Sequence, residues 1–122
     1  VSQIKHKRPK IILGLGNPGV NYLQHRHNVG FWFLDEIINR HQLSKKERPN
    51  YMVYPWVHEY GTTYLIRSKL YMNDTGLALS KAKNFYKVET DEVCVAYDDM
   101  DFTPGELRVK KAGGDQSLPF LS

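Results

Sequence analysis

The strongest constraint on the fold is a short apolar run that ends in a glycine-rich loop. The run is Lys10-Ile-Ile-Leu-Gly-Leu15, and the loop that follows, Gly16 to Asn28, is rich in Gly, Asn, Pro and His. An apolar run of this length is typical of a buried strand. A second such run, Val93 to Tyr97, leads into Asp98-Asp-Met-Asp101. We therefore expect two buried strands whose carboxyl ends carry polar loops.

Two helices are predicted between these strands. The first covers Val29 to His41, with Asn28 as its N-cap. The second opens at Asp74 or Thr75. The apolar positions expected to face the core are Val29, Trp32, Phe33, Ile37, Ile38 and His41 in the first helix, and Leu77, Leu79, Ala82, Phe85 and Tyr86 in the second.

The remaining segments predict a hairpin and a final strand. Tyr51 to Tyr60 and Thr62 to Ser68 are rich in aromatic and β-branched residues and are separated by Gly61. Pro55 places the first of these strands at an edge or at a bulge. Glu106 to Lys110 alternates as a strand with a basic face, whereas Ser44 to Asn50 is expected to be a solvated linker. The prediction is an α/β fold of three αβα layers around a mixed, mostly parallel sheet.

Length and composition narrow the class of protein. The 122 residues suit a single domain spanning 1–122, and no apolar stretch approaches the roughly 18–20 residues of a membrane span. We expect no secretory signal, because Val1 to Lys10 is basic and strand-like residues follow it. The single cysteine, Cys94, excludes an intrachain disulfide and favours a reducing compartment. The net charge of +4 is compatible with a polyanionic partner such as RNA.

Two patterns suggest ligand sites but match them poorly. Gly14-Leu-Gly-Asn-Pro-Gly19 has the spacing of the dinucleotide fingerprint, yet a loop intervenes before the helix, and Asp35 and Glu36 fall inside that helix rather than at a strand end. His25 and His27 could face the same way and bind a metal. Zinc needs three or four protein ligands, however, and the only thiol lies in an apolar strand. We therefore expect neither a metal nor an organic cofactor.

A third combination of residues suggests hydrolysis by an activated water. His27 and Asp98 both lie on loops at the carboxyl ends of predicted parallel strands, where α/β proteins place their sites. A neutral histidine can take a proton from water, and a carboxylate on its other nitrogen fixes its tautomer. The amides of Asn17 and Asn73 could orient the water or donate to an oxyanion.

Each of these residues also has a structural interpretation. Asn17 precedes Pro18-Gly19 and can simply form a turn, and Asn73 can act as a helix N-cap. Asp98 can belong to a solvated turn, and a lone histidine is often structural. These alternatives stay open from spacing alone.

Several motifs together resemble a known family. Gly14-Leu-Gly-Asn-Pro-Gly19, Tyr22 and Arg26-His-Asn-Val-Gly30 resemble the signature of bacterial-type peptidyl-tRNA hydrolase. The same order continues with Tyr71-Met-Asn-Asp-Thr-Gly76, with Tyr97-Asp-Asp-Met-Asp101 followed by Pro104-Gly105, and with Lys110-Lys-Ala-Gly-Gly114. The resemblance runs from about residue 10 to residue 114, and residues 115–122 form a divergent tail.

The resemblance implies an enzyme that cleaves the ester between a peptide and the 3′ ribose of tRNA, which recycles tRNA in translation. It implies His27 as the catalytic base and Asp98 as the carboxylate that orients it, with no metal or organic cofactor. It further implies that Asn17 and Asn73 position the peptide and the water. The residues implied to bind substrate or tRNA are Tyr22, Asn28 and Lys110.

The chain departs from the family pattern after Gly114. It reads Asp115 to Ser122 where the family continues with a glycine- and histidine-rich loop, a lid, another strand and a helix. We therefore expect a C-terminally incomplete domain with weak or absent turnover, and a monomer whose exposed sheet edge favours association. The alternative functions are an RNA-binding protein without catalysis on the same fold, or an inactive truncated form. The bacterial cytoplasm is the expected location, with a mitochondrial or plastid origin as the alternative.

Overall fold

The computed structural model describes residues 8–16, 29–70, 74–98 and 107–111, and for Asp98 and Arg108 the backbone alone. These residues form a six-stranded sheet with the order β2-β3-β4-β1-β5-β6 and two α-helices. The elements in chain order are β1 (Ile11–Gly14), α1 (Val29–His41), β2 (Lys46–Glu47), β3 (Tyr51–His58), β4 (Gly61–Ser68), α2 (Thr75–Tyr86), a 3-10 turn (Thr90–Glu92), β5 (Val93–Asp98) and β6 (Leu107–Lys111).

The short strand β1 lies between two parallel neighbours. Ile11 is in register with Tyr64 of β4 on one side and with Val93 of β5 on the other. The outer pairs, β2–β3, β3–β4 and β5–β6, are antiparallel. Strands β1, β2, β4 and β5 therefore run in one direction and β3 and β6 in the other. This confirms the predicted α/β fold with a mixed sheet.

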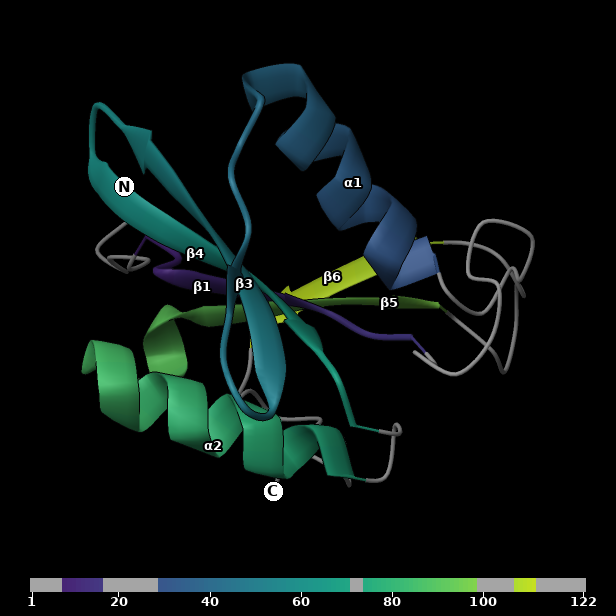
Figure 1. Cartoon of the computed structure of the whole chain (residues 1–122), viewed down its shortest axis with the longest axis vertical. Coiled ribbons are helices and arrows are strands. Elements are labelled where there is room, and N and C mark those ends of the chain that lie inside the picture. Colours follow the sequence, from purple (N-terminus) through teal and green to yellow (C-terminus); the bar gives the residue numbers. More distant parts are fainter. Residues whose placement is uncertain (1–7, 17–28, 71–73, 99–106, 112–122) are drawn as a thin grey trace, which may run out of the picture.

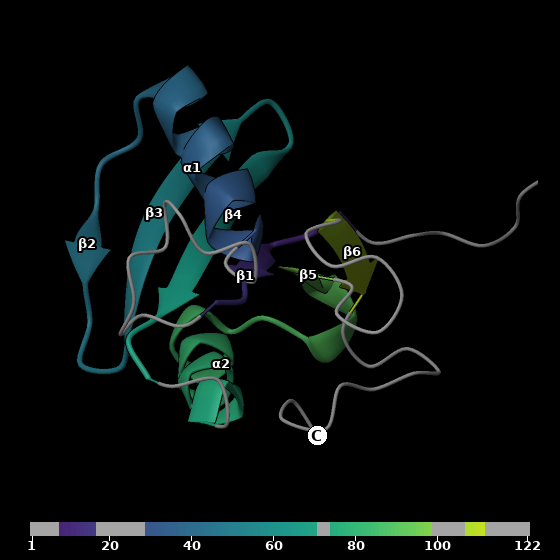
Figure 2. The same ribbon diagram turned by 90° about the vertical axis from the view of Figure 1, so that its right-hand side faces the viewer.

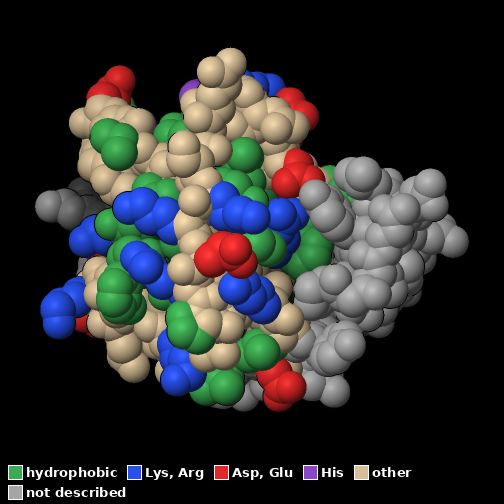
Figure 3. All heavy atoms as spheres, viewed as in Figure 1, with side chains coloured by type: hydrophobic (Ala, Val, Ile, Leu, Met, Phe, Trp, Pro, Cys, Tyr) green, Lys and Arg blue, Asp and Glu red, His purple; other side chains and the backbone are tan. Residues whose placement is uncertain are grey.

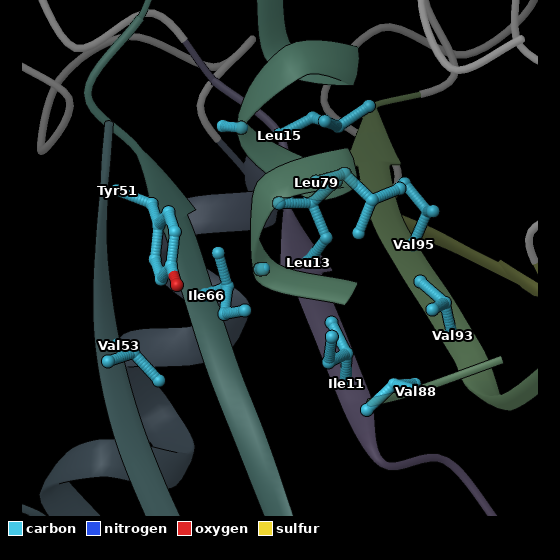
Figure 4. Packing of buried hydrophobic residues seen from close by; sticks show 12 residues of the cluster. Ile11, Leu13, Leu15, Tyr51, Val53, Ile66, Leu79, Val88, Val93 and Val95 are labelled. Carbon is cyan, nitrogen blue, oxygen red and sulfur yellow. The ribbon is translucent and has the colours of Figure 1, made fainter. Parts of the chain in front are cut away.

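The two helices cover opposite faces of the sheet (Figures 1 and 2). On the α2 face, Ile11 and Leu13 of β1 are fully buried and belong to one cluster with the buried Leu79 of α2. Figure 4 shows these side chains converging with residues of β3, β4 and β5. On the α1 face, Ile12 packs with Leu34 of α1. Alternate residues of β1 thus serve two cores, as expected for a strand buried on both faces.

The helices were predicted with nearly the right bounds but with partly wrong core residues. In α2, Leu77 and Phe85 are 53% and 60% exposed. The buried positions are spaced i, i+3, i+4 and i+7, and two of them are alanines, so the stripe that meets the sheet excludes Leu77 and Phe85. In α1 the pattern overlooked Phe31 and Leu34, which are buried to 1% and 0% exposure. The buried residues of α2 are Thr75, Ala78, Leu79 and Ala82.

The segment predicted as a linker contains an edge strand. Lys46 and Glu47 form β2, paired with Val53 and Met52 of β3. Pro55 lies beyond this two-residue pairing, at a position where β3 has no described neighbour other than β4. Figure 3 shows Lys and Arg side chains gathered on the face that this edge presents. Exposed lysines on an edge strand oppose pairing with another chain.

Candidate active site at the carboxyl ends of the central strands

The parallel strands β1, β4 and β5 end at the same edge of the sheet. β1 ends at Gly14, β4 at Ser68 and β5 at Asp98, and in Figure 1 the ends of β1 and β5 lie on the right. Sites in open α/β sheets lie outside the carboxyl ends of the strands. The candidate site residues that follow β1 and β4 in the chain, and Asp98 at the end of β5, therefore belong to this edge, whereas Lys110 lies within β6.

Most of the predicted site residues fall outside the described part of the chain. Asp98 is the last residue of β5, with its backbone described, and Lys110 lies half-buried on β6. Lys110 is in register with Val95 of β5, which lies three residues before Asp98 at the end of that strand. The residues outside the described ranges are Asn17, Tyr22, His27, Asn28 and Asn73.

The start of α1 lies directly against β1 and β5. A Cβ atom at Gly30 would lie 2.5 Å from the carbonyl oxygen of Leu15 and closer still to that of Ala96. A Cβ atom at Gly14 would lie 2.6 Å from the carbonyl oxygen of Gly30. Only glycine allows two backbones to approach so closely. The first turn of α1, which follows His27 and Asn28 in the chain, therefore sits two residues from the end of β5.

A buried arginine ties the same helix to β4. Arg67 is 9% exposed, and its guanidinium donates to Asp35 Oδ1 (3.4 Å) and to the hydroxyl of Tyr54 (3.2 Å). It also lies 5.2 Å from the ring centroid of Phe31. Because Phe31 and Asp35 belong to the first two turns of α1, these contacts hold the N-terminal part of that helix on the sheet.

The sequence analysis overlooked Arg67. A charged residue within the apolar run Leu65-Ile-Arg-Ser68 is the one local signal of a buried ion pair, and it does not identify the partner.

Cys94 has the properties of a structural thiol. It is half-buried on the α1 face of β5. Burial raises the pKa of the Cys94 thiol, and the nearby Lys111 offsets this only in part. A raised pKa leaves less thiolate near neutral pH, so Cys94 is a poor nucleophile.

We therefore expect Cys94 to react slowly with iodoacetamide. At pH 8 the folded chain should be alkylated roughly tenfold more slowly than the chain unfolded in about 8 M urea. In the folded chain, both the fraction of thiolate and the access of the reagent to Cys94 are reduced. Mass spectrometry of timed samples measures the two rates. Equal rates would contradict a buried thiol of raised pKa.

Two further observations concern the described residues alone. Among them, no group of three His, Cys, Asp or Glu side chains is placed to hold a metal ion. The pair His25 and His27 lies outside the described ranges. Among the described residues, neither α-helix has the length and apolar character needed to cross a membrane.

Comparison with known proteins identifies the family. The sequence model described as peptidyl-tRNA hydrolase matches residues 11–118. The chain belongs to the peptidyl-tRNA hydrolase family. A peptidyl-tRNA hydrolase of Francisella tularensis subsp. holarctica is 42% identical over 107 residues, which are 86% of this chain and 56% of the relative. One of Colwellia psychrerythraea is 37% identical over 86% of this chain and 55% of its own length.

Solved structures of peptidyl-tRNA hydrolases share the fold. A crystal structure of the Acinetobacter baumannii protein matches with a TM-score of 0.76 at 32% identity, covering 91% of this chain and 58% of that one. A variant of the same protein matches with a TM-score of 0.77 at 31% identity and covers 92% of this chain. The chain thus spans somewhat more than half the length of the peptidyl-tRNA hydrolases it matches.

Proposed function

We propose that this chain hydrolyses the ester bond between a peptide and the 3′ ribose of tRNA. Membership of the peptidyl-tRNA hydrolase family supports this substrate class. The observation that carries the proposal for this chain is the contact of Gly30 with the backbone at Ala96. Gly30 follows His27 by three residues and Ala96 precedes Asp98 by two, so this contact supports a short distance between His27 and Asp98.

The chain length limits how far apart the two residues can be. His27 precedes Gly30 by three positions, and Asp98 follows Ala96 by two. Each residue of extended chain spans at most about 3.6 Å. The two short segments therefore keep His27 and Asp98 on the same side of the molecule. An imidazole and a carboxylate in hydrogen-bond contact are compatible with this placement.

The proposed reaction needs one base and one water. The imidazole of His27 removes a proton from the water, which attacks the ester carbonyl carbon. The tetrahedral intermediate then collapses, the bond to the ribose oxygen breaks, and that oxygen receives the proton from the imidazolium. The products are a peptide with a free carboxylate and a tRNA with a free 3′ hydroxyl.

The remaining residues have supporting roles in the proposal. Asp98 accepts a hydrogen bond from the other imidazole nitrogen and stabilises the imidazolium. The amides of Asn17 and Asn73 position the peptide and the water and donate to the oxyanion. Tyr22 and Asn28 contact the end of the tRNA. Lys110 pairs with a tRNA phosphate, as the positive net charge of the chain allows. The reaction requires no metal or organic cofactor.

A direct assay tests this function. The purified chain is incubated with a defined peptidyl-tRNA, and the free peptide and deacylated tRNA are quantified over time. A parallel sample carries the chain joined to the C-terminal part of a family member, because the relatives extend over nearly twice the matched length. We expect peptide release from the joined protein and a lower rate from the chain alone. Binding of tRNA by both proteins without release from either would contradict the hydrolase proposal and favour the RNA-binding alternative.

A further inference from the structure

A pocket lies at the end of the sheet opposite the candidate active site. It has a volume of about 390 Å³ and is lined in part by the start of β1 and by the tip of the β3–β4 hairpin. In Figure 1 this hairpin tip lies on the left, whereas the carboxyl ends of β1 and β5 lie on the right. The volume falls within the roughly 300–1,000 Å³ of small-molecule sites. The residues used below are Arg8, Trp56, His58, Glu59, Tyr60 and Thr63.

Aromatic rings follow one another along this end of β3. The ring of Trp56 stacks on His41 with centroids 4.9 Å apart and meets the edge of His58 at 5.0 Å. His58 in turn lies 6.2 Å from the ring of Tyr60. Trp56 and His58 are alternate strand residues and so share one face of the hairpin. The pocket wall therefore combines the aromatic rings of Trp56, His58 and Tyr60 with the aliphatic side chains of Pro9 and Ile12.

Hydrogen bonds hold His58 in one orientation and one tautomer. The Thr63 hydroxyl donates to the carbonyl oxygen of Pro9 (2.9 Å), so it accepts from Nε2–H of His58 (2.8 Å). The backbone N–H of Tyr60 donates to Nδ1 of the same ring (3.2 Å). Both ring nitrogens are thereby satisfied in the neutral form. The hairpin tip and the start of β1 are joined through this ring, which preorganises the pocket.

A cation lies at the rim. The guanidinium carbon of Arg8 is 3.5 Å from the centroid of the Tyr60 ring. This contact uses the face of the guanidinium and leaves N–H donors on its edge for an anion. Tyr60 is 60% exposed, and Glu59, which carries a carboxylate, is also a lining residue of the pocket. Stacking surfaces, an anion partner and a hydrogen-bond acceptor are thus combined in one site.

We propose that this pocket binds a nucleotide through an unpaired base. The base stacks on the aromatic wall, as bases do in single-strand binding proteins. The phosphate pairs with Arg8, since guanidinium groups match phosphate oxygens in geometry. The Glu59 carboxylate accepts from an exocyclic amine, which favours adenine, guanine or cytosine over uracil. None of the residues that line this pocket belongs to the glycine motif Gly14–Gly19, and the proposal does not depend on the proposed hydrolase function.

Adenosine 5′-monophosphate is the probe, and the indole N–H of Trp56 is the reporter. The indole signals of Trp32 and Trp56 are distinguished in nitrogen–proton correlation spectra by the loss of one signal in Trp56→Phe. We expect a saturable shift of the Trp56 signal with the mononucleotide, a weaker effect with adenosine and none with ribose 5-phosphate. No shift of Trp56 at saturating probe concentrations would overturn the proposal.

Two exposed side chains give variants that should fold normally. Arg8→Gln and Tyr60→Ala should each weaken binding by about tenfold, through loss of the phosphate contact and of the stacking surface. Arg40→Gln is the matched control, because it removes one exposed positive charge that pairs with Glu36 on α1. An equal loss in Arg40→Gln and Arg8→Gln would show non-specific charge attraction and overturn the proposal.

The nucleotide can come from solution or from RNA, and two further probes separate these sources. Tighter binding of a single-stranded oligoadenylate than of the mononucleotide identifies an unpaired RNA base as the ligand. Equal or weaker binding of the oligomer identifies a free nucleotide. A fully paired RNA duplex should leave the Trp56 signal in place, and a shift by the duplex equal to that by the single strand would contradict recognition of an unpaired base.

Discussion

Replacing His27 with alanine is expected to lower the rate of peptide release by about 10²–10⁴-fold, the usual contribution of a general base. The variant lacks the group that accepts the proton of the attacking water, while the contacts that hold α1 on the sheet stay in place. The measurement is a single-turnover time course with saturating enzyme and a defined peptidyl-tRNA, using whichever form of the chain shows release.

Two comparisons separate a base from a merely structural residue. His41→Gln removes an exposed imidazole from the last residue of α1 and should leave release unchanged. Added imidazole should restore part of the rate to His27→Ala, because a small base can enter the vacated space. Asp98→Asn should also slow release. Unchanged turnover in His27→Ala, or an equal loss in His41→Gln, would refute the role of His27.

Replacing Gly30 with alanine is expected to destabilise the fold by about 3 kcal/mol, at the upper end of the usual cost of overpacking. The new methyl group would overlap the carbonyl oxygens of Ala96 in β5 and of Leu15 directly after β1, which are backbone atoms and cannot turn aside. In an ordinary helix the same substitution stabilises by about 1 kcal/mol, because alanine has the higher helix propensity. The predicted effect therefore has the opposite sign.

Thermal unfolding followed by circular dichroism measures this effect. Gly30→Ala should lower the Tm by about 10 °C. Asn39→Ala, at an exposed position of the same helix, is the control and should leave the Tm unchanged or slightly higher. A Tm for Gly30→Ala at or above that of the parent would contradict the close packing of α1 on β1 and β5.

The elements that were predicted well carry local signals. The helix Val29–His41 was predicted with its observed bounds, since its apolar residues recur at helical spacing. The strands around Ile11–Gly14 and Val93–Asp98 were evident as short apolar runs. The strand Lys46–Glu47 was missed because two charged residues become a strand only through pairing with β3. Nothing in their own composition favours that structure.

The candidate site was predicted from motifs, and its geometry was not. Glycine within a helix pattern indicates only a low helix propensity, so the contact of Gly30 with Ala96 could not be foreseen. The pairing of Arg67 with Asp35 joins residues far apart in the chain, and periodicity carries no information on such pairs. His27, Asn17 and Asn73 lie outside the described residues, so their roles stay predictions.

The central position of β1 has a consequence for folding during synthesis. Ile11 to Gly14 leave the ribosome well before both strands that flank them, β4 and β5. The β3–β4 hairpin, with its short turn at Glu59-Tyr60, can form on its own timescale of microseconds. The nascent chain therefore holds an apolar segment without strand partners until β4 emerges, and one edge of that segment stays open until β5 follows. An open strand edge of this kind favours aggregation during synthesis.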